Sequence, residues 1–392
     1  MIPLQMEFGW QRGEMSYAVS VASLCAVFVS IVLGYLVDRF GVRKIALPSI
    51  VLLGLTIGAM RGLTGAIWEY YFAFFCIAVL GAGTSVLVFS KLILNWFDRR
   101  RGLALGLAIA GVGLGQALIP PGTTYVINHY GWREAYLSLG LLILVVGGGV
   151  CWVLIREFPR SMGLSKDGID TDASDTLASA SQPAGFTFKE AMGTRPFWLM
   201  LGSFFLVGLC IHGCAAHLIP LLVDRGISAQ RAAGFMSALG IAVIFGRIFA
   251  GYLMDRIFAP WVGIGFMLAP VIGLSLLALG ASGGIALLAA ILLGLAIGAE
   301  FDILGYFISR YIGLRVFGLA YGLMLACFQL GGSIGPVIMG RGFDQTGVYT
   351  NVLWLFVGMF GVTCVLFSLL GPYPSLPGLA EERGDEGIAN EF

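Results

Sequence analysis

The chain has 392 residues, of which 58% are hydrophobic and only 11% are charged. A soluble domain needs about a quarter of its residues charged to cover its surface, so this composition excludes a soluble globular protein. The formal net charge of +1 gives no electrostatic reason to expect a nucleic-acid partner.

Eleven stretches are apolar enough, and at about 20 residues or more long enough, to cross a bilayer as helices. In chain order they are residues 15–37, 45–65, 68–92, 102–127, 134–155, 196–223, 231–253, 260–281, 283–308, 317–340 and 350–371. One set of the loops between them carries fifteen Lys and Arg residues, and the opposite set carries six. Because basic residues concentrate on the cytoplasmic side, this bias predicts a cytoplasmic C-terminus and places the first residue outside. The sequence therefore predicts an all-α integral membrane protein surrounded by lipid.

The chain repeats itself at an offset of about 217 residues. The segment from Gly34 to Arg39 matches Gly251 to Arg256, and residues 102–107 match 318–323. Several matches in the same order at one offset indicate an internal duplication. They divide the chain into four parts: an N-terminal helical bundle (1–155), a cytoplasmic linker (156–195), a C-terminal helical bundle (196–371) and a cytoplasmic tail (372–392). Two parallel bundles joined by such a linker resemble the major facilitator fold.

The linker and the tail differ in composition from the bundles. Residues 166–182 are rich in Ser, Asp and Ala, which predicts a flexible segment. Phe186, Phe188 and Met192 then predict a short helix lying along the membrane surface. The tail from Gly378 onwards is acidic and is predicted to be disordered.

The duplication also reveals a difference between the two halves. The second half opens with the span 196–223, which has no counterpart before the matching segment of the first half. We therefore number the spans as helices 2 to 12 of a twelve-helix fold, and expect the true start to lie upstream. The alternative is an eleven-span protein that does not transport.

The loop that joins the first two spans carries a signature. Residues Asp38 to Lys44, with Gly34 before them, match the cytoplasmic loop pattern G-x-x-x-D-R-x-G-x-R-[KR] of the major facilitator superfamily. An aspartate at a helix end can pair with a basic run and hold an inner gate shut. The alternative is a loop that only sets topology. The predicted gating residues are Asp38, Arg39, Arg43, Arg99, Arg100 and Asp255, the last belonging to a weaker second copy.

The segment from Trp96 to Gly111 is more specific. It resembles the helix-5 signature of the monocarboxylate porter family, an aromatic-Phe-x-basic-Arg-Arg-x-Leu-Ala-x-Gly-x-Ala-x-Ala-Gly pattern. Phe8-Gly9-Trp10 and Arg310-Tyr311-Ile312-Gly313 look like the bacterial branch of that family. The resemblance implies a carrier of small organic anions in a bacterial inner membrane. The family's other signature lies in helix 1, which this chain lacks.

Arg247 is the leading candidate for a substrate contact. It lies near mid-depth of the span 231–253, where a guanidinium is costly unless it is paired or lines a wet cavity. Its planar fork suits a carboxylate. Monocarboxylate porters are similar in having an arginine in this helix that is implicated in anion binding, although the aspartate that often precedes it is Val243 here. The alternative is a structural pair with an acidic residue on another helix.

Other polar residues within the spans are weaker candidates. Glu300 and Asp302 must be paired, protonated or hydrated, so one is expected to pair with Arg247 and the other to carry a proton. His217 is a second candidate for proton coupling, and Tyr306 and Gln329 are candidates for lining the substrate cavity. Lys91 is expected to reach toward the cytoplasmic headgroups. The alternative is a purely structural network.

No pattern in the sequence supports catalysis, a cofactor, a metal site or a nucleotide-hydrolysing partner. We therefore predict a secondary transporter that carries a small organic anion, monocarboxylate-like, by rocking one bundle against the other. The resemblance implies coupling to protons or exchange for a second anion. The alternatives are an efflux carrier for an amphipathic drug or metabolite and a non-transporting receptor or inactive product.

Overall fold

The computed structural model describes residues 2–10, 12–164 and 185–377, and every regular element within them is a helix. This confirms the all-α prediction. Nine helical segments of the described residues are long and apolar enough to cross a membrane. Two further helices, α2 (Arg12–Phe40) and α6 (Arg101–Tyr130), have 29 and 30 residues and lie where the other two spans were expected.

The first bundle contains α1 to α8. A short α1 (Ile2–Phe8) precedes α2, and α3 (Val42–Ala59) ends in a 3-10 turn, η1 (Met60–Gly62). The next spanning segment consists of α4 (Ile67–Leu80), a 3-10 turn, η2 (Gly81–Thr84), and α5 (Val86–Trp96). After α6, α7 (Trp132–Leu142) continues through a π-helical turn, η3 (Ile143–Gly148), into α8 (Gly149–Leu154). A last 3-10 turn, η4 (Pro159–Met162), follows.

The second bundle contains α10 to α16. A one-turn helix, α10 (Phe188–Met192), leads into α11 (Arg195–Asp224), α12 (Ala229–Met254) and α13 (Ala259–Ala278). The chain continues in α14 (Gly283–Tyr311), α15 (Phe317–Thr346) and α16 (Thr350–Ser368). All of these except α10 contain a predicted span, because apolar length decides where a helix can cross lipid.

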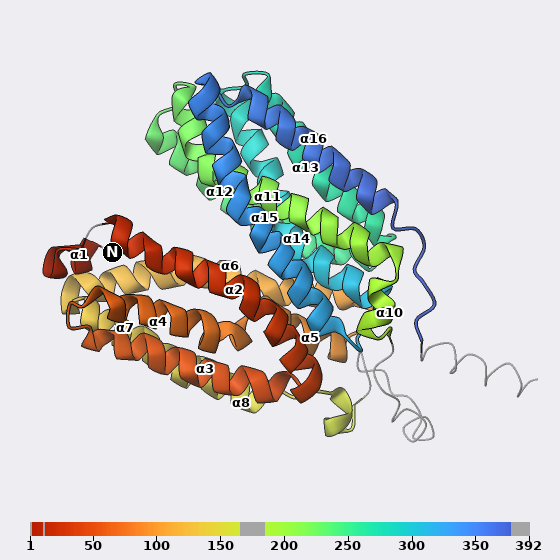
Figure 1. Ribbon diagram of the computed structural model, residues 1–392, viewed down its shortest axis with the longest axis horizontal. Coiled ribbons are helices and arrows are strands. Elements are labelled where there is room, and N and C mark those ends of the chain that lie inside the picture. The colour runs from red at the N-terminus through yellow and green to blue at the C-terminus, as the bar shows by residue number, and fades with distance from the viewer. Residues whose placement is uncertain (1, 11, 165–184, 378–392) are drawn as a thin grey trace, which may run out of the picture.

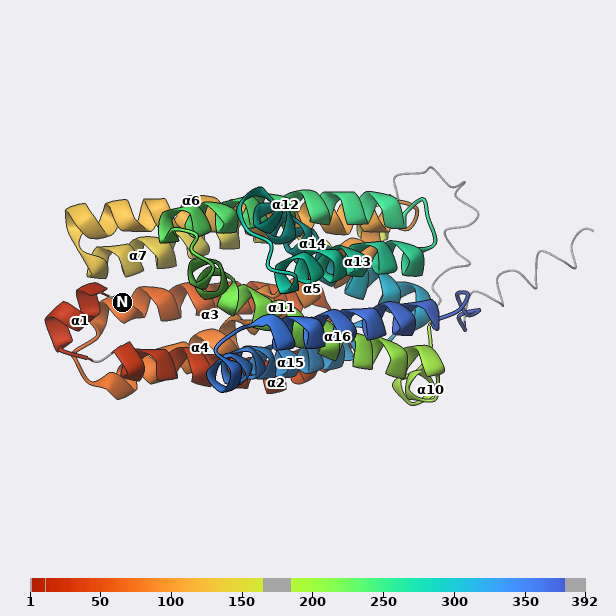
Figure 2. The ribbon, with the colours of Figure 1, turned by 90° about the horizontal axis from the view of Figure 1, so that it is seen from above.

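The two bundles meet at one end and diverge toward the other (Figure 1). We call the end that carries the turn at Gly41, the loop between α5 and α6, and α10 the linker end. Here α2 of the first bundle packs on α15 of the second, and α6 packs on α12. Seen at right angles, the long helices of both bundles run roughly parallel (Figure 2).

The end of the first bundle opposite to the linker end is closed by α1, which the sequence did not predict. Glu7 accepts hydrogen bonds from the Trp132 indole and the Arg133 guanidinium, both at 2.6 Å, and these bonds hold the pKa of Glu7 below its usual value. Gly9 adopts φ +70°, which lets the chain turn so that Trp10 can donate to the Gly65 carbonyl at 3.0 Å. The Phe8-Gly9-Trp10 segment therefore fastens α1 onto the bundle.

The end of the linker and the start of the tail are tied to the loop that follows α14. The Phe186 amide donates to the Ile312 carbonyl and the Gly185 amide donates to the Pro377 carbonyl, both at 3.0 Å. The predicted short helix is present as α10, which begins at a capping box between Thr187 and Glu190. Its Phe188 packs edge-on against Phe197 of α11. Residues 166–182 and the tail from 378 lie outside the described residues.

Candidate functional site

Asp38 of α2 caps the first turn of α15, which belongs to the other bundle. Its two carboxylate oxygens accept from the backbone amides of Gly318 and Leu319, at 2.9 and 2.8 Å. The first amides of a helix have no partner within the helix and lie at the positive end of its dipole. An aspartate stabilises them both by accepting their hydrogen bonds and by its negative charge. The cap is a direct bond between the bundles at the linker end.

Asp255 makes the same contact in the reverse direction. It follows α12 of the second bundle, and its carboxylate accepts from the amides of Gly102 and Leu103 at 2.7 and 2.9 Å. These amides begin α6 of the first bundle. The duplicated aspartates therefore form a reciprocal pair of caps: an aspartate of each bundle caps the N-terminus of a helix in the other bundle. From the sequence, Asp255 was predicted only as part of a weaker copy of the loop motif.

Glycines allow the capped helices to approach so closely. A Cβ at Gly34 would collide with the Gly318 carbonyl, and one at Gly102 would collide with the Gly251 carbonyl. One turn farther from the linker end, Gly322 faces the Ser30 carbonyl and Gly106 faces the Arg247 carbonyl. The duplicated segments thus build two glycine contacts of the same design, related by the repeat.

Lys91 of α5 completes the Asp38 cap. Its ammonium lies 2.5 Å from the Asp38 carboxylate and donates to the Val37 carbonyl at 3.3 Å, with the lysine side chain 10% exposed. The expectation that Lys91 reaches toward the headgroups is therefore wrong. The ion pair of Asp38 is therefore with Lys91, and not with the basic run Arg99–Arg101 that a gating aspartate was expected to use.

The predicted gating arginines make local contacts or lie on the surface. Arg39 donates to the Tyr35 hydroxyl at 2.8 Å, and Arg43 lies over the Trp152 ring at 5.6 Å. Both contacts stay within the first bundle. Arg99 and Arg100 are exposed in the loop before α6. The structure thus brings Asp38 and Asp255 to the junction of the bundles and places these four arginines around it.

Arg247 of α12 points across the junction toward the first bundle. Its guanidinium donates to the Ile109 carbonyl of α6 at 3.2 Å, and the residue is only 8% exposed. Arginine has five N–H donors, and this is the one hydrogen bond that the guanidinium makes among the described residues. Within the described part of the chain, Arg247 has no carboxylate within ion-pairing distance.

Glu300 and Asp302 of α14 are buried near Arg247, and its charge acts on both. The structure does not place either carboxyl group within ion-pairing distance of the guanidinium. Both oxygens of Asp302 and one oxygen of Glu300 lack a hydrogen-bond partner among the described residues. The buried hydroxyls of Tyr321 on α15 and Ser90 on α5 lie close to each other across the junction of the bundles. Sequence reasoning missed these two hydroxyls, since neither residue type is unusual in a membrane helix.

The remaining candidates are more scattered. Tyr306 is buried one turn from Asp302, and Arg310 lies over its ring at 5.4 Å. Gln329 is half-buried on α15, two turns beyond Gly322 and therefore on the same helix face, which meets α2.

His217 has both ring nitrogens engaged inside the second bundle. They lie 3.1 Å from the Tyr349 hydroxyl and 3.1 Å from the Pro336 carbonyl. A carbonyl only accepts, so the nitrogen facing Pro336 carries a hydrogen, while the Tyr349 hydroxyl can donate to or accept from the other nitrogen. These contacts tie α11 to α15 and to the start of α16.

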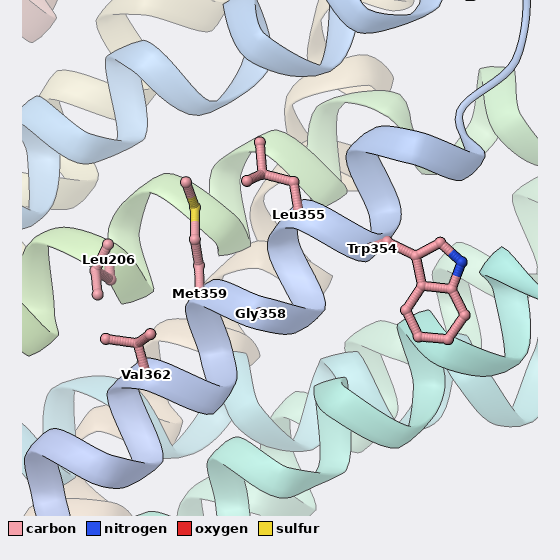
Figure 3. Close-up of a pocket in the computed structure, with 6 residues that line it drawn as sticks. All are labelled: Leu206, Trp354, Leu355, Gly358, Met359 and Val362. Atoms are coloured by element: carbon pink, nitrogen blue, oxygen red, sulfur yellow. The ribbon is translucent and has the colours of Figure 1, made fainter.

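Apolar grooves on the outer surface offer no site for an anion. One, of about 410 Å³, lies between α11 and α16 and is lined by Leu206, Trp354, Leu355, Gly358, Met359 and Val362 (Figure 3). Every group that lines it is apolar except the indole nitrogen of Trp354. Its chemistry matches the hydrocarbon of a bilayer, in which such a surface is expected.

Comparison with known proteins identifies the family. The model of the Major Facilitator Superfamily matches residues 1–336. The chain belongs to the major facilitator superfamily. It is therefore a transporter and not an enzyme, in agreement with the prediction from the sequence.

Among its superfamily relatives, mouse monocarboxylate transporter 11 is 27% identical over 270 residues, which are 65% of this chain and 56% of that protein. The chain thus spans about half the length of that relative. The uncharacterized transporter YcxA of Bacillus subtilis (strain 168) is 22% identical over 93% of this chain and 88% of its own length.

Solved structures support the fold. The Escherichia coli fucose:proton symporter FucP aligns with a TM-score of 0.70 at 14% identity, covering 92% of each chain. A FucP structure in the outward conformation aligns with the same TM-score at 16% identity, covering 95% of this chain and 93% of that one. At such identities the likeness concerns the fold alone, and it confirms the major facilitator architecture.

Proposed function

We propose that this transporter carries small organic anions, with Arg247 binding the carboxylate of the substrate. A buried guanidinium with five donors and, among the described residues, one carbonyl partner is stabilised by an anion that accepts two parallel bonds. Arg247 also extends from the second bundle to the first, so a ligand held there touches both moving parts. The names of the monocarboxylate transporter relatives support the same class of substrate.

Alternating access follows from the way the bundles meet. The basic loops favour the cytoplasm for the linker end, so in the described conformation the bundles meet on the cytoplasmic side and diverge toward the outside (Figure 1). Closure depends on the Asp38 and Asp255 caps, each of which uses two backbone amides of the opposite bundle. To open the cytoplasmic side, both caps must break while the bundles rock about the substrate.

The test is uptake of radiolabelled pyruvate, L-lactate and benzoate into proteoliposomes containing the wild type or Arg247→Ala. We expect uptake of at least one carboxylate, and a decrease of at least about 30-fold in the variant at subsaturating substrate. Truncating one partner of a buried charge pair costs about 2 kcal/mol or more, which corresponds to that factor. Arg247→Lys is expected to retain only part of the wild-type uptake, because an ammonium cannot form the two parallel hydrogen bonds of a guanidinium.

Arg225→Ala is the matched control. Arg225 also donates to a backbone carbonyl, that of Ala281 at 3.1 Å, but it does so within the second bundle. Its loss should leave uptake near the wild-type rate. Wild-type uptake of all three carboxylates at background level, or an Arg247→Ala variant as active as the wild type, would contradict the proposal. Efflux of an amphipathic dye that survives Arg247→Ala would favour a drug carrier instead.

A further inference from the structure

An apolar groove on the outer surface of the second bundle ends beside a positive charge. It runs between α12 and α13 and has a volume of about 410 Å³, like the groove of Figure 3. Its walls include Phe249, Leu253 and Ile257 of α12 and the turn after it, Trp261 and Gly265 of α13, and Leu295 of α14. Neither the proposed anion site nor the caps at the linker end use any of these residues.

The groove opens away from the first bundle. A Cβ at Gly251, which lies two residues from both Phe249 and Leu253, would collide with the Gly102 carbonyl of α6. Residues two apart on a helix point about 200° apart, so Phe249 and Leu253 face the opposite way. Phe249 is 55% exposed and Trp261 is 63% exposed. A solute that crosses between the bundles would not touch this surface, whereas a lipid of the surrounding bilayer would.

Arg256 supplies the positive charge at the linker end of the groove. It lies in the turn that follows α12 and directly precedes Ile257, which lines the groove. Its side chain is exposed, and its guanidinium rests over the ring of Tyr252 at 4.2 Å. Tyr252 in turn precedes Leu253 of the lining. The stacking therefore holds the charge beside the end of the groove.

The protein does not neutralise this charge. Within the described ranges, no carboxylate lies within ion-pairing distance of Arg256. The neighbouring Asp255 carboxylate accepts hydrogen bonds from the Gly102 and Leu103 amides of α6. Stacking on an aromatic face leaves the N–H groups at the edge of a guanidinium available to an acceptor. Arg256 can therefore bind an anion without breaking a contact inside the protein.

The groove and Arg256 together indicate which lipid fits. The apolar walls suit an acyl chain, and a guanidinium can donate two parallel hydrogen bonds to a phosphate. Trp261, in the first turn of α13, has the amphipathic ring that is enriched at the level of the headgroups. A zwitterionic lipid also carries an ammonium, which Arg256 repels, whereas an anionic lipid does not.

We propose that this groove binds one anionic phospholipid, with an acyl chain between α12 and α13 and the phosphate on Arg256. The basic loops favour the cytoplasm for the linker end, so the lipid comes from the cytoplasmic leaflet, whose surface is negatively charged. The groove of Figure 3 has no Lys or Arg within four residues of its lining along α11 or α16. That groove should accept acyl chains without selecting a headgroup.

The test is native mass spectrometry of the full chain, purified without bound lipid and titrated in detergent with dioleoyl phosphatidylglycerol or dioleoyl phosphatidylcholine. The two lipids share acyl chains and differ in headgroup charge. At its first site the wild type should bind phosphatidylglycerol at least about fivefold more tightly, the factor for one basic residue beside an anionic lipid. Arg256→Gln should lower that affinity to the value for phosphatidylcholine.

Gly265→Leu tests the apolar part of the site. A Cβ at Gly265 meets no described atom within 4 Å, so a leucine there extends into the groove. It should weaken the first phosphatidylglycerol site at least about tenfold, which corresponds to lost contact with two methylenes. Gly358→Leu is the matched control, since Gly358 lines the other groove and its Cβ also meets no described atom. Arg315→Gln, which removes another exposed arginine, is the control for charge. Both controls should bind like the wild type.

Fluorescence in a bilayer gives a second measurement. In phosphatidylcholine vesicles that contain a small fraction of brominated phosphatidylglycerol, the bromine quenches nearby tryptophans. Trp261→Phe should remove more of this quenching than Trp354→Phe, because Trp354 lines the groove of Figure 3.

Four results would overturn the proposal. They are equal affinity of the wild type for the two lipids, unchanged selectivity in Arg256→Gln, the same loss of selectivity in Arg315→Gln, and equal quenching of Trp261 and Trp354. A dimer that Gly265→Leu dissociates would assign the groove to a second copy of the chain instead. None of these results depends on whether the protein carries anions.

Discussion

At the scale of single residues, Lys91 shows what keeps a buried aspartate charged. The Asp38 carboxylate is mostly removed from water and accepts two helix amides, and the Lys91 ammonium supplies the compensating charge. Two charges taken out of water are tolerated when they are paired and when hydrogen bonds satisfy the rest of the site. Lys91 is thus part of the cap, although it touches only the first bundle.

Lys91→Ala should destabilise the protein by about 3 kcal/mol or more, because it leaves Asp38 as an uncompensated buried charge. Asp38→Asn in the same background should recover part of that loss, since the amide needs no counter-charge. Thermal unfolding in detergent, followed with a dye that reacts with the seven native cysteines, measures both effects. Lys189→Ala, which removes an exposed lysine of α10, is the control. Equal unfolding temperatures for the two lysine variants would refute this role.

The residues that sequence reasoning could single out are those whose cost in lipid is visible one at a time. Arg247, Glu300 and Asp302 stand out because a charge at mid-membrane demands an explanation. Lys91 was assigned to the headgroups because only its depth along one helix could be judged. Its partner, Asp38, lies 53 residues away, and pairing over such a distance depends on how the helices pack.

At the scale of elements, apolar length located the helices that cross the membrane, since lipid leaves a chain few other ways to satisfy its backbone. The same signal could not detect α1, which has seven residues and is held by Glu7 and Trp10. It also could not show that the duplicated aspartates cap helices of the opposite bundle. The glycine contacts likewise became visible only in the structure, which shows which glycines meet.

Gly102→Ala should weaken the junction of α6 with α12, because the added methyl group collides with the Gly251 carbonyl. Overpacking of this kind costs about 1–3 kcal/mol. A lower unfolding temperature in detergent and slower carboxylate uptake are the expected results. Gly111→Ala on the same helix is the control, since its Cβ would meet no described atom within 4 Å. Equal effects of the two substitutions would show that the contact is unimportant.

At the scale of the whole molecule, the two caps act together because both must break before the linker end opens. Each consists of two charge-assisted hydrogen bonds, worth about 1.5–3 kcal/mol apiece. Removing one cap leaves the other to hold the bundles, whereas removing both leaves the glycine contacts and the hydrogen bonds that Arg247 and Ser30 donate to carbonyls of the opposite bundle. The closed state should therefore lose population stepwise.

Leu105→Cys, in a protein whose seven native cysteines are replaced, reports on that opening. Leu105 is fully buried at the junction, so a thiol there should react slowly with a membrane-impermeant reagent applied from the linker end. Asp38→Asn combined with Asp255→Asn should accelerate the reaction at least about tenfold, which needs a shift of only 1.4 kcal/mol. The alkylation rate of each single variant should lie between the rates of the protein with both caps and of the double variant. Identical alkylation rates in all four proteins would show that the caps do not hold the gate.

The reciprocity of the caps restricts how the halves of this chain can be exchanged. The amides of Gly102 and Gly318, in the first turns of α6 and α15, each donate to an aspartate from the opposite half. Halves produced as separate polypeptides should consequently function only when both are present and assembled. A chimera that borrows one half from a relative should work when the donor contributes its own capping aspartate, whatever the identity of its other residues.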